Sequence, residues 1–173
     1  MRTMSALLSC FARRLRRGIR GDEGSNLVEL GMAMLIFLPL LLGTIEFSLV
    51  FLTYHEMTDA ARQAARWAAV RGSTSCTNTP SLPDCDATSA DIQSFVQGIG
   101  YPGLAPANIS VSTSWLTATA TTPTSWSACS AGACNAPGNQ VQVTVSYAYP
   151  ISIPYWKATS VNVSSTAAMV IAQ

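Results

Sequence analysis

One acidic residue near the start of a long apolar stretch is the residue of this chain best placed to do chemistry. Residues 27–42 are apolar or small except for Glu29. A carboxylate in a membrane segment costs on the order of 2–3 kcal/mol even by lenient scales, so a chain that needed only an anchor would not carry one there. We therefore interpret Glu29 as a group that pairs with a partner, and Gly24, five residues earlier, as a processing point. The alternative is that Glu29 lies among the lipid headgroups and extends toward water.

The cysteines are the second group of residues that could take part in chemistry. Cys10 lies in a basic N-terminal segment, while Cys76 and Cys85, and then Cys129 and Cys134, form two close pairs beyond the apolar stretch. An even number of cysteines in a polar, exported region indicates disulfides. Three pairings are open, of which two local loops are the simplest. Zinc is the competing interpretation, but these spacings lack a second tight pair and a supporting histidine.

No combination of residues predicts catalysis. The chain has no glycine-rich phosphate loop, and its one histidine, His55, is expected near the membrane boundary. Asp84, Asp86 and Asp91 lack the spacing of a calcium-binding loop. We therefore expect no enzymatic activity, no metal and no cofactor.

Charge is distributed very unevenly along the 173 residues. Only 11% of them are charged, and six of the ten basic residues fall in the first 20 positions. From Ser25 onward four basic and seven acidic residues leave a net charge of −3, which argues against a nucleic-acid-binding surface. A basic segment before a membrane span holds that end on the cytoplasmic side, so the residues after the span lie across the membrane. Membrane lipid is therefore an expected partner.

The apolar stretch is long enough to cross a membrane. Residues 30–52 contain one charge, Glu46. As a helix, they would span the ~30 Å hydrocarbon layer. Pro39 removes one backbone hydrogen bond and is expected to bend the helix. The helical pattern continues to Arg71, so we predict one helix over residues 25–71, about 65–70 Å long. Glu46 should lie near the outer membrane boundary, either solvated or in contact with an arginine of a partner.

Alanines recur on one face of the second half of this predicted helix. They are Ala60, Ala61, Ala64, Ala65, Ala68 and Ala69. Such a face allows close approach of a neighbouring helix in an assembly. It equally allows packing under the protein's own sheet, which is the interpretation we favour.

Residues 72–173 predict a small exported domain. Residues 73–88 form a loop, and Thr88 with Asp91 resembles a capping box, which predicts a helix over 90–97. Strands are predicted over 108–116, 141–149 and 159–171, with a loop over 117–139 and with Pro150 ending the middle strand. An antiparallel sheet of about three strands beside one long helix is an α+β fold, and the alanine face can cover the sheet.

These features resemble the TadE-like family of the tight-adherence (Flp) pilus system, whose members are minor pilins or pseudopilins. The residues that carry the resemblance are Gly24, Glu29, Pro39, Gly43-Thr44-Ile45-Glu46-Phe47 and the alanine-rich segment 60–69. It is specific over about residues 24–69 and only architectural beyond Gly72. Leu30 departs from the pattern, since members commonly have an aromatic residue after the acid.

The resemblance implies that a prepilin peptidase cuts between Gly24 and Ser25. The new α-amino group is cationic near neutral pH, and Glu29 of a neighbouring subunit could neutralise it within an apolar helix bundle. Other implied partners are pilin or pseudopilin subunits and inner-membrane pilus assembly proteins. The implied location is the bacterial inner membrane, crossed once, with the C-terminal domain in the periplasm or carried into an extracellular pilus. The implied role is pilus assembly in adhesion and biofilm formation.

Two functional classes remain open. The first is the minor pilin or pseudopilin, with a type II secretion pseudopilin as a variant whose leader is usually shorter than 24 residues. The second is a stand-alone, membrane-anchored protein whose outer domain binds a surface or a polysaccharide. The mass of the mature protein separates the classes, because only the first loses residues 1–24.

Overall fold

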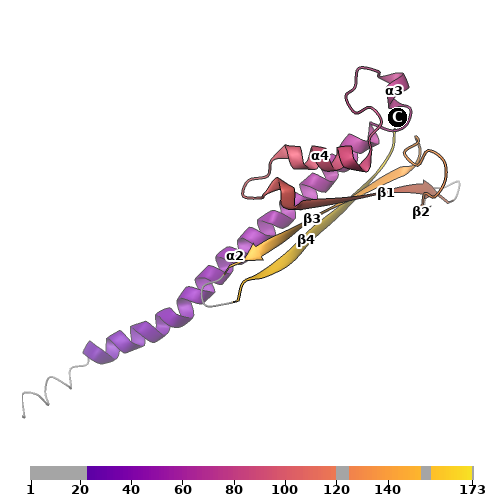
Figure 1. Ribbon diagram of the computed structural model, residues 1–173. Coiled ribbons are helices and arrows are strands. Elements are labelled where there is room, and N and C mark those ends of the chain that lie inside the picture. Colours follow the sequence, from indigo (N-terminus) through magenta and orange to yellow (C-terminus); the bar gives the residue numbers. More distant parts are fainter. Residues whose placement is uncertain (1–22, 120–124, 153–156, 173) are drawn as a thin grey trace, which may run out of the picture. The chain divides into compact units, whose positions relative to one another are not determined.

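The computed structural model describes residues 23–119, 125–152 and 157–172 (Figure 1). The basic segment with Cys10, most of the predicted leader 1–24 and part of the predicted loop 117–139 lie outside the described residues. The helices are α2 Glu23–Ala69, α3 Ser75–Asn78, α4 Ser89–Ile99 and the short 3-10 helix η1 Pro106–Asn108. The strands are β1 Ile109–Ala118, β2 Trp126–Ala128, β3 Gln140–Ile151 and β4 Thr159–Val170. The fold is α+β, as predicted.

The chain divides into two compact units, residues 1–45 and residues 46–173. The described part of the first unit is helical throughout and belongs to α2. α2 is apolar and long enough to cross a membrane, and none of the side chains in its apolar window is buried. A helix that is apolar on all sides is stable only in lipid or against a partner.

α2 begins at Glu23 and ends at Ala69, within two residues of each predicted bound. It continues through Pro39, which lies in the helix interior. The bend predicted at Pro39 stays a prediction. No described glycine or proline lies between Gly43 and the end of α2, which fits the uninterrupted helix there.

The second unit contains one antiparallel sheet in the order β2-β1-β3-β4. β3 is central and alternates strictly, with Val141, Val143, Val145 and Tyr147 buried and the residues between them more exposed. Because directly paired residues share a face, Ile109 opposite Tyr147 and Val163 opposite Tyr147 extend this inner face to both neighbouring strands.

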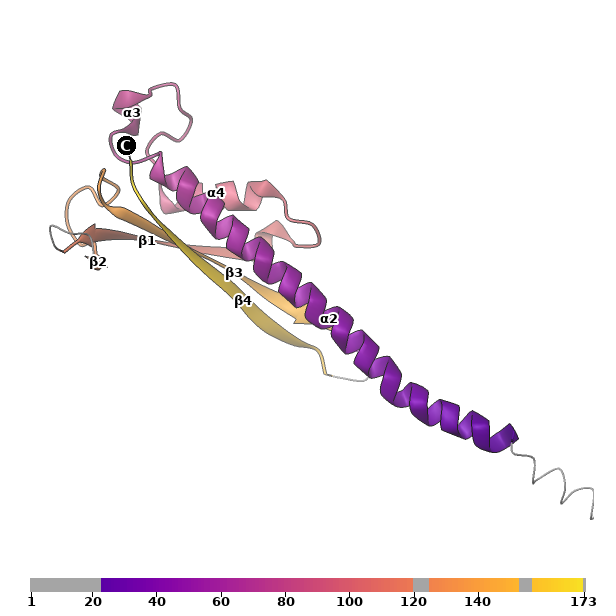
Figure 2. The same cartoon turned by 180° about the vertical axis from the view of Figure 1, so that it is seen from behind.

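The alanine face packs into the protein's own core, as we favoured. All six alanines from Ala60 to Ala69 are at most 3% exposed, and they belong to one buried cluster with the inner residues of β3. The end of the last strand is tied to the end of the helix, because the Ala172 amide donates to the Ala69 carbonyl at 2.9 Å. In Figure 2, β3 and β4 run along this second part of α2.

α4 (Ser89–Ile99) begins one residue before the predicted helix 90–97 and ends two residues after it. Thr88 and Asp91 form the predicted capping box, and Gly100 follows the helix with φ 73°. Such a left-handed conformation costs glycine little. Ile92 and Val96 face the core, and the Phe95 ring stacks on Trp67 of α2 with ring centroids 5.1 Å apart.

Three details of the prediction were wrong. The sheet has a fourth strand, β2, inside the predicted loop 117–139; it is three residues long and pairs only with the end of β1. Pro150 does not end β3, which continues to Ile151 opposite β4. Because β1 pairs with β3 only as far as Tyr147, β3 has a free side at Pro150, and a free side tolerates a missing N–H. The predicted loop 73–88 contains the single-turn helix α3.

Candidate functional site

The predicted processing and pairing residues lie in the first turns of α2. Gly24, Ser25 and Glu29 are all exposed. Among the described residues, Glu29 has no hydrogen bond or ion pair, and its neighbours Val28 and Leu30 are 63% and 55% exposed. An acid surrounded by exposed apolar side chains is suited to a positive group that another molecule supplies.

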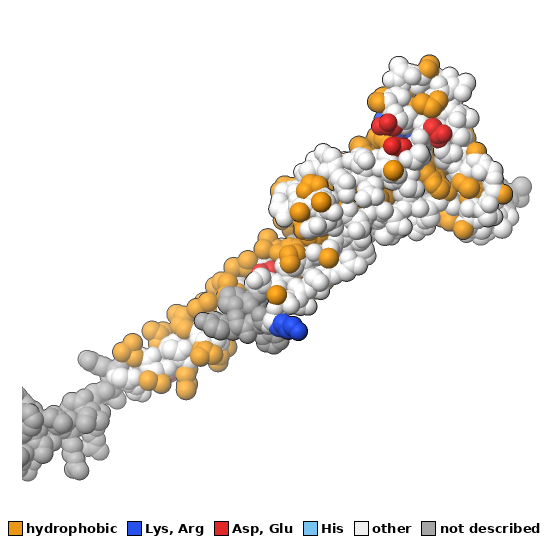
Figure 3. All heavy atoms as spheres, in the orientation of Figure 1, with side chains coloured by type: hydrophobic (Ala, Val, Ile, Leu, Met, Phe, Trp, Pro, Cys, Tyr) orange, Lys and Arg blue, Asp and Glu red, His pale blue; other side chains and the backbone are white. Residues whose placement is uncertain are grey.

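The apolar side chains around Glu29 form an extended exposed surface. Leu27, Met32, Leu35 and Ile36 are each more than two-thirds exposed. Hydrophobic side chains cover much of the face of α2 shown in Figure 3. An apolar surface of this size marks a membrane-facing or protein-binding region rather than a solvated one. Pro39 lies within it and leaves the carbonyl of Leu35 without its helical donor.

Glu46 has a partner that neither interpretation of the sequence included. The Tyr149 hydroxyl of β3 donates to the Glu46 carboxylate at 3.4 Å, across 103 positions of sequence. Burial and the neighbouring carboxylate together raise the pKa of Tyr149. Because Glu46 is the first residue of the second unit, this contact ties the start of that unit's helix to its sheet.

The four cysteines that follow α2 in the chain form two local disulfide loops. Cys76 pairs with Cys85 and Cys129 with Cys134, with Cα–Cα distances of 4.9 Å and 5.6 Å. Asn135 joins the two loops. Its carbonyl accepts from the Ser73 amide at 3.1 Å, and its side-chain amide donates to Asp86. Each disulfide therefore closes its own loop, and the hydrogen bonds of Asn135 hold the two loops together.

Arg71 is a structural residue that the sequence did not single out. Its guanidinium lies 4.2 Å from the centre of the Trp67 ring and donates to the carbonyls of Pro83 and Trp67. Burial lowers the pKa of Arg71, and Asp84 opposes that shift. Arginine stacked on an aromatic ring with two carbonyl acceptors fixes the loop around the first disulfide to the end of α2.

The predicted site residues therefore do not form one catalytic cluster. Gly24, Ser25, Glu29 and Pro39 belong to the first unit, whereas the four cysteines belong to the second. The arrangement provides an exposed helix for insertion or assembly and a separately stabilised domain. The Tyr149 contact of Glu46 could not be found from local sequence pattern.

Comparison with known families agrees with the resemblance noted from the sequence. Residues 24–66 match the family model described as TadE-like protein. The match covers Gly24, Glu29, Pro39 and Glu46, and none of the four strands. No curated protein and no solved structure gave a significant match to the chain. The similarity is thus confined to the helix, and the sheet domain is described by its structure alone.

Proposed function

We propose that this chain is a minor pilin or pseudopilin that is cut by a prepilin peptidase and assembles into a tight-adherence pilus. The TadE-like match of residues 24–66 supports an association with that pilus system. The observation that carries the finer proposal is Glu29, an exposed acid without a described partner at the start of an exposed apolar helix, five residues after Gly24.

The proposed chemistry follows from the two charges. Cleavage of the Gly24–Ser25 peptide bond by water leaves a carboxylate on Gly24 and an α-amino group on Ser25. That amino group has an ordinary pKa of about 8 and is largely cationic at neutral pH. In an apolar bundle each charge is costly alone, and pairing of the Ser25 ammonium with Glu29 of a sister subunit offsets part of the cost of both. The pair would set the axial register between subunits.

The decisive experiment is the mass and N-terminal sequence of the protein extracted from its native membrane. The proposal expects a chain that begins at Ser25. In Gly24→Leu, a bulky side chain at the cleavage site should block processing. The folded chain has open space there, with nothing within 4 Å of an added Cβ.

Gly43→Leu is the matched control, because Gly43 also has open space in α2 and lies far from the bond to be cut. It should be processed normally. A native protein that retains residues 1–24 would contradict the proposal.

The outer face of the sheet supports a second candidate function, an anchored protein that binds a surface or a polysaccharide. By strand register this face carries uncharged polar side chains on three strands: Ser110, Ser112, Ser114, Gln142, Thr144, Ser146, Asn162, Ser164 and Thr166. Trp126 of β2 lies at one end of the same face. Hydroxyl and amide groups beside an aromatic ring suit a sugar surface. Retention of residues 1–24 together with loss of glycan binding in Trp126→Ala would favour this function.

A further inference from the structure

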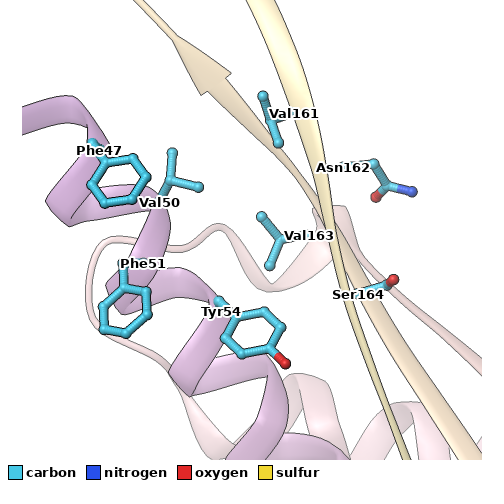
Figure 4. Close-up of a pocket in the computed structure, with 8 residues that line it drawn as sticks. All are labelled: Phe47, Val50, Phe51, Tyr54, Val161, Asn162, Val163 and Ser164. Atoms are coloured by element: carbon cyan, nitrogen blue, oxygen red, sulfur yellow. The ribbon is translucent and has the colours of Figure 1, made fainter. Parts of the chain in front are cut away.

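The end of the sheet that is next to Glu46 restricts where a membrane can begin. β4 lies beside α2 near its start, where Val161 and Val163 point toward Phe47, Val50, Phe51 and Tyr54 (Figure 4). Together with Asn162 and Ser164 they line a pocket of about 370 Å³. At its other end β4 leads to Ala172, whose amide donates a hydrogen bond to the carbonyl of Ala69 at the end of α2.

The rise per residue in β4 and in α2 shows which residue of α2 lies beside the first residue of β4. From Val163 to Thr159 a strand extends about 13 Å further, which equals about nine helical residues. Thr159 therefore reaches the level of Glu46. The Tyr149–Glu46 hydrogen bond supports this placement, because Tyr149 pairs with Val161 and Thr159 lies two strand residues further along, at or beyond the level of Glu46.

This end of the sheet is incompatible with hydrocarbon. β4 is an edge strand of the described sheet, so one side of its backbone has no strand partner there. Thr159, Ser160 and Asn162 are exposed, and Lys157 just before them is exposed as well. Unpaired backbone and polar side chains do not lie within the hydrocarbon layer. A span that ended at Leu52 would submerge all of them.

The adjacent face of the helix has the opposite character. Phe47, Phe51 and Tyr54 are 72%, 55% and 48% exposed and follow one another at helical spacing. Aromatic side chains gather where a membrane-spanning helix enters the headgroup layer. Lys157 is the only charged side chain after Asp91 in the sequence, and its ammonium complements lipid phosphates.

We propose that Phe47, Phe51, Tyr54, Lys157 and Thr159 form a headgroup surface that seats in the outer phospholipid headgroup layer, so that the hydrocarbon span ends at Glu46 rather than at Leu52. About 20 helical residues cross the layer, so the span covers about residues 26–45. Glu29 then lies about 5 Å inside the inner edge of the hydrocarbon rather than outside it. The inference rests on α2 crossing a membrane, which the proposed function also requires.

The test measures depth by nitroxide labelling of the full chain in vesicles of phosphatidylethanolamine and phosphatidylglycerol. In a Cys10→Ser background, with both disulfides kept oxidised, single cysteines replace Leu41, Phe47, Leu52 or Thr159. Power saturation with oxygen and with a water-soluble nickel chelate reports the depth of each label. All four positions are exposed, so the labels replace no core contact.

We expect the label at position 41 to lie in hydrocarbon and those at positions 47 and 159 near the phosphate level. The label at position 52 should lie outside the hydrocarbon, in the outer part of the headgroup layer. A span ending at Leu52 would instead place the label at position 47 about 8 Å inside the hydrocarbon, which overturns the proposal. A fully aqueous label at position 159 also overturns it. Lys157→Glu should move that label outward, while Lys157→Arg should not.

A second copy of the chain is the competing occupant of the headgroup surface. Diluting the protein to about one chain per vesicle separates the two explanations. Depths that persist at that dilution support lipid, and shielding that disappears on dilution overturns the proposal in favour of self-association. Because the vesicles contain no peptidase and no other pilus protein, failure here is distinct from failure of the proposed processing and assembly.

Discussion

The Tyr149 hydroxyl of β3 donates a hydrogen bond to the carboxylate of Glu46 in α2 at 3.4 Å. This contact joins the first residue of the second unit to the central strand of its sheet. It gives Glu46 a role within the chain, at the position where the helix leaves the exposed apolar region and begins to pack against a sheet.

Tyr149→Phe removes this hydrogen bond while keeping the ring that packs against the core. The bond is long and partly solvated, so we expect the free energy of unfolding to fall by only about 0.5–1 kcal/mol. Glu46→Gln retains an acceptor and should cost less. Thermal unfolding of the full chain in detergent measures both. A loss of several kcal/mol in Tyr149→Phe would show that the ring had moved and that the bond was not the cause.

Ala64→Leu tests the close packing of the helix under the sheet. Ala64 is completely buried, and three extra carbon atoms at a filled position strain the core by about 1–3 kcal/mol. Arg62→Leu places the same side chain on the exposed side of the same turn and should change the unfolding free energy by less than about 0.5 kcal/mol. Equal effects of the two variants, read from unfolding midpoints, would contradict the observed orientation of α2.

The alanine face of α2 and the alternating pattern of β3 show what the sequence predicts well. Alanine spacing placed residues 60–69 in the core because a helix repeats its faces every 3.6 residues, and alternation placed β3 because strands repeat every two residues. The capping box of α4 was found from four adjacent positions for the same reason, since the signal is local. Such periodic or local signals need no knowledge of the rest of the chain.

The features that the sequence did not predict depend on distant partners. β2 is three residues long and exists because Trp126, Ser127 and Ala128 pair with the end of β1. Pro150 is tolerated because β1 has already ended beside β3. Tyr149 reaches Glu46 across 103 positions. None of these relationships leaves a repeating pattern in the nearby sequence, so each needed the folded chain.

Tyr101→Phe should stabilise the protein at neutral pH. The Tyr101 hydroxyl is buried without a hydrogen-bond partner among the described residues, so its removal should raise the unfolding free energy by up to about 1 kcal/mol. Burial, with Asp59 and Glu56 nearby, raises the pKa of Tyr101 to about 12. The phenol of the unfolded chain ionises at about pH 10, about two pH units before that of the folded chain. The free energy of unfolding therefore falls as the pH rises from about 10 through 12, because only the unfolded chain can release this proton there.

The measurement is unfolding of the full chain between pH 7 and pH 12, where Tyr101→Phe should show a smaller alkaline loss of stability. Tyr54→Phe is the control, because that side chain is 48% exposed, and it should match the unmodified chain. A Tyr101→Phe protein that is less stable at pH 7 would indicate that a water molecule satisfies the hydroxyl.

Removing either disulfide should weaken the domain by a similar amount. The sequence separations are nine and five, and chain-entropy arguments give about 2–3 kcal/mol for loops of these sizes. Because Asn135 connects the two loops, the double removal of Cys76–Cys85 and Cys129–Cys134 should deviate from the sum of the separate removals. Serine replacements compared by unfolding give the coupling. In an Asn135→Ala background that deviation should shrink, and an unchanged deviation would assign the coupling to another contact.

Glu29→Ala tests whether the acid acts between subunits. The side chain is exposed and makes no described contact within the chain, so the variant should fold, insert and be cut as before. Under the proposed function, its loss would leave the Ser25 ammonium of a sister subunit unpaired in an apolar bundle. We therefore expect incorporation into pili to fall at least tenfold, equivalent to about 1.4 kcal/mol or more. Glu29→Gln keeps the size of the side chain without its charge and should behave like alanine if charge pairing is the cause. Incorporation is measured by the amount of this chain in sheared filaments relative to the amount in membranes, and the mature mass is checked in parallel. Normal processing with normal incorporation would remove the intersubunit role and leave Glu29 as an acid whose side chain extends toward the headgroup layer.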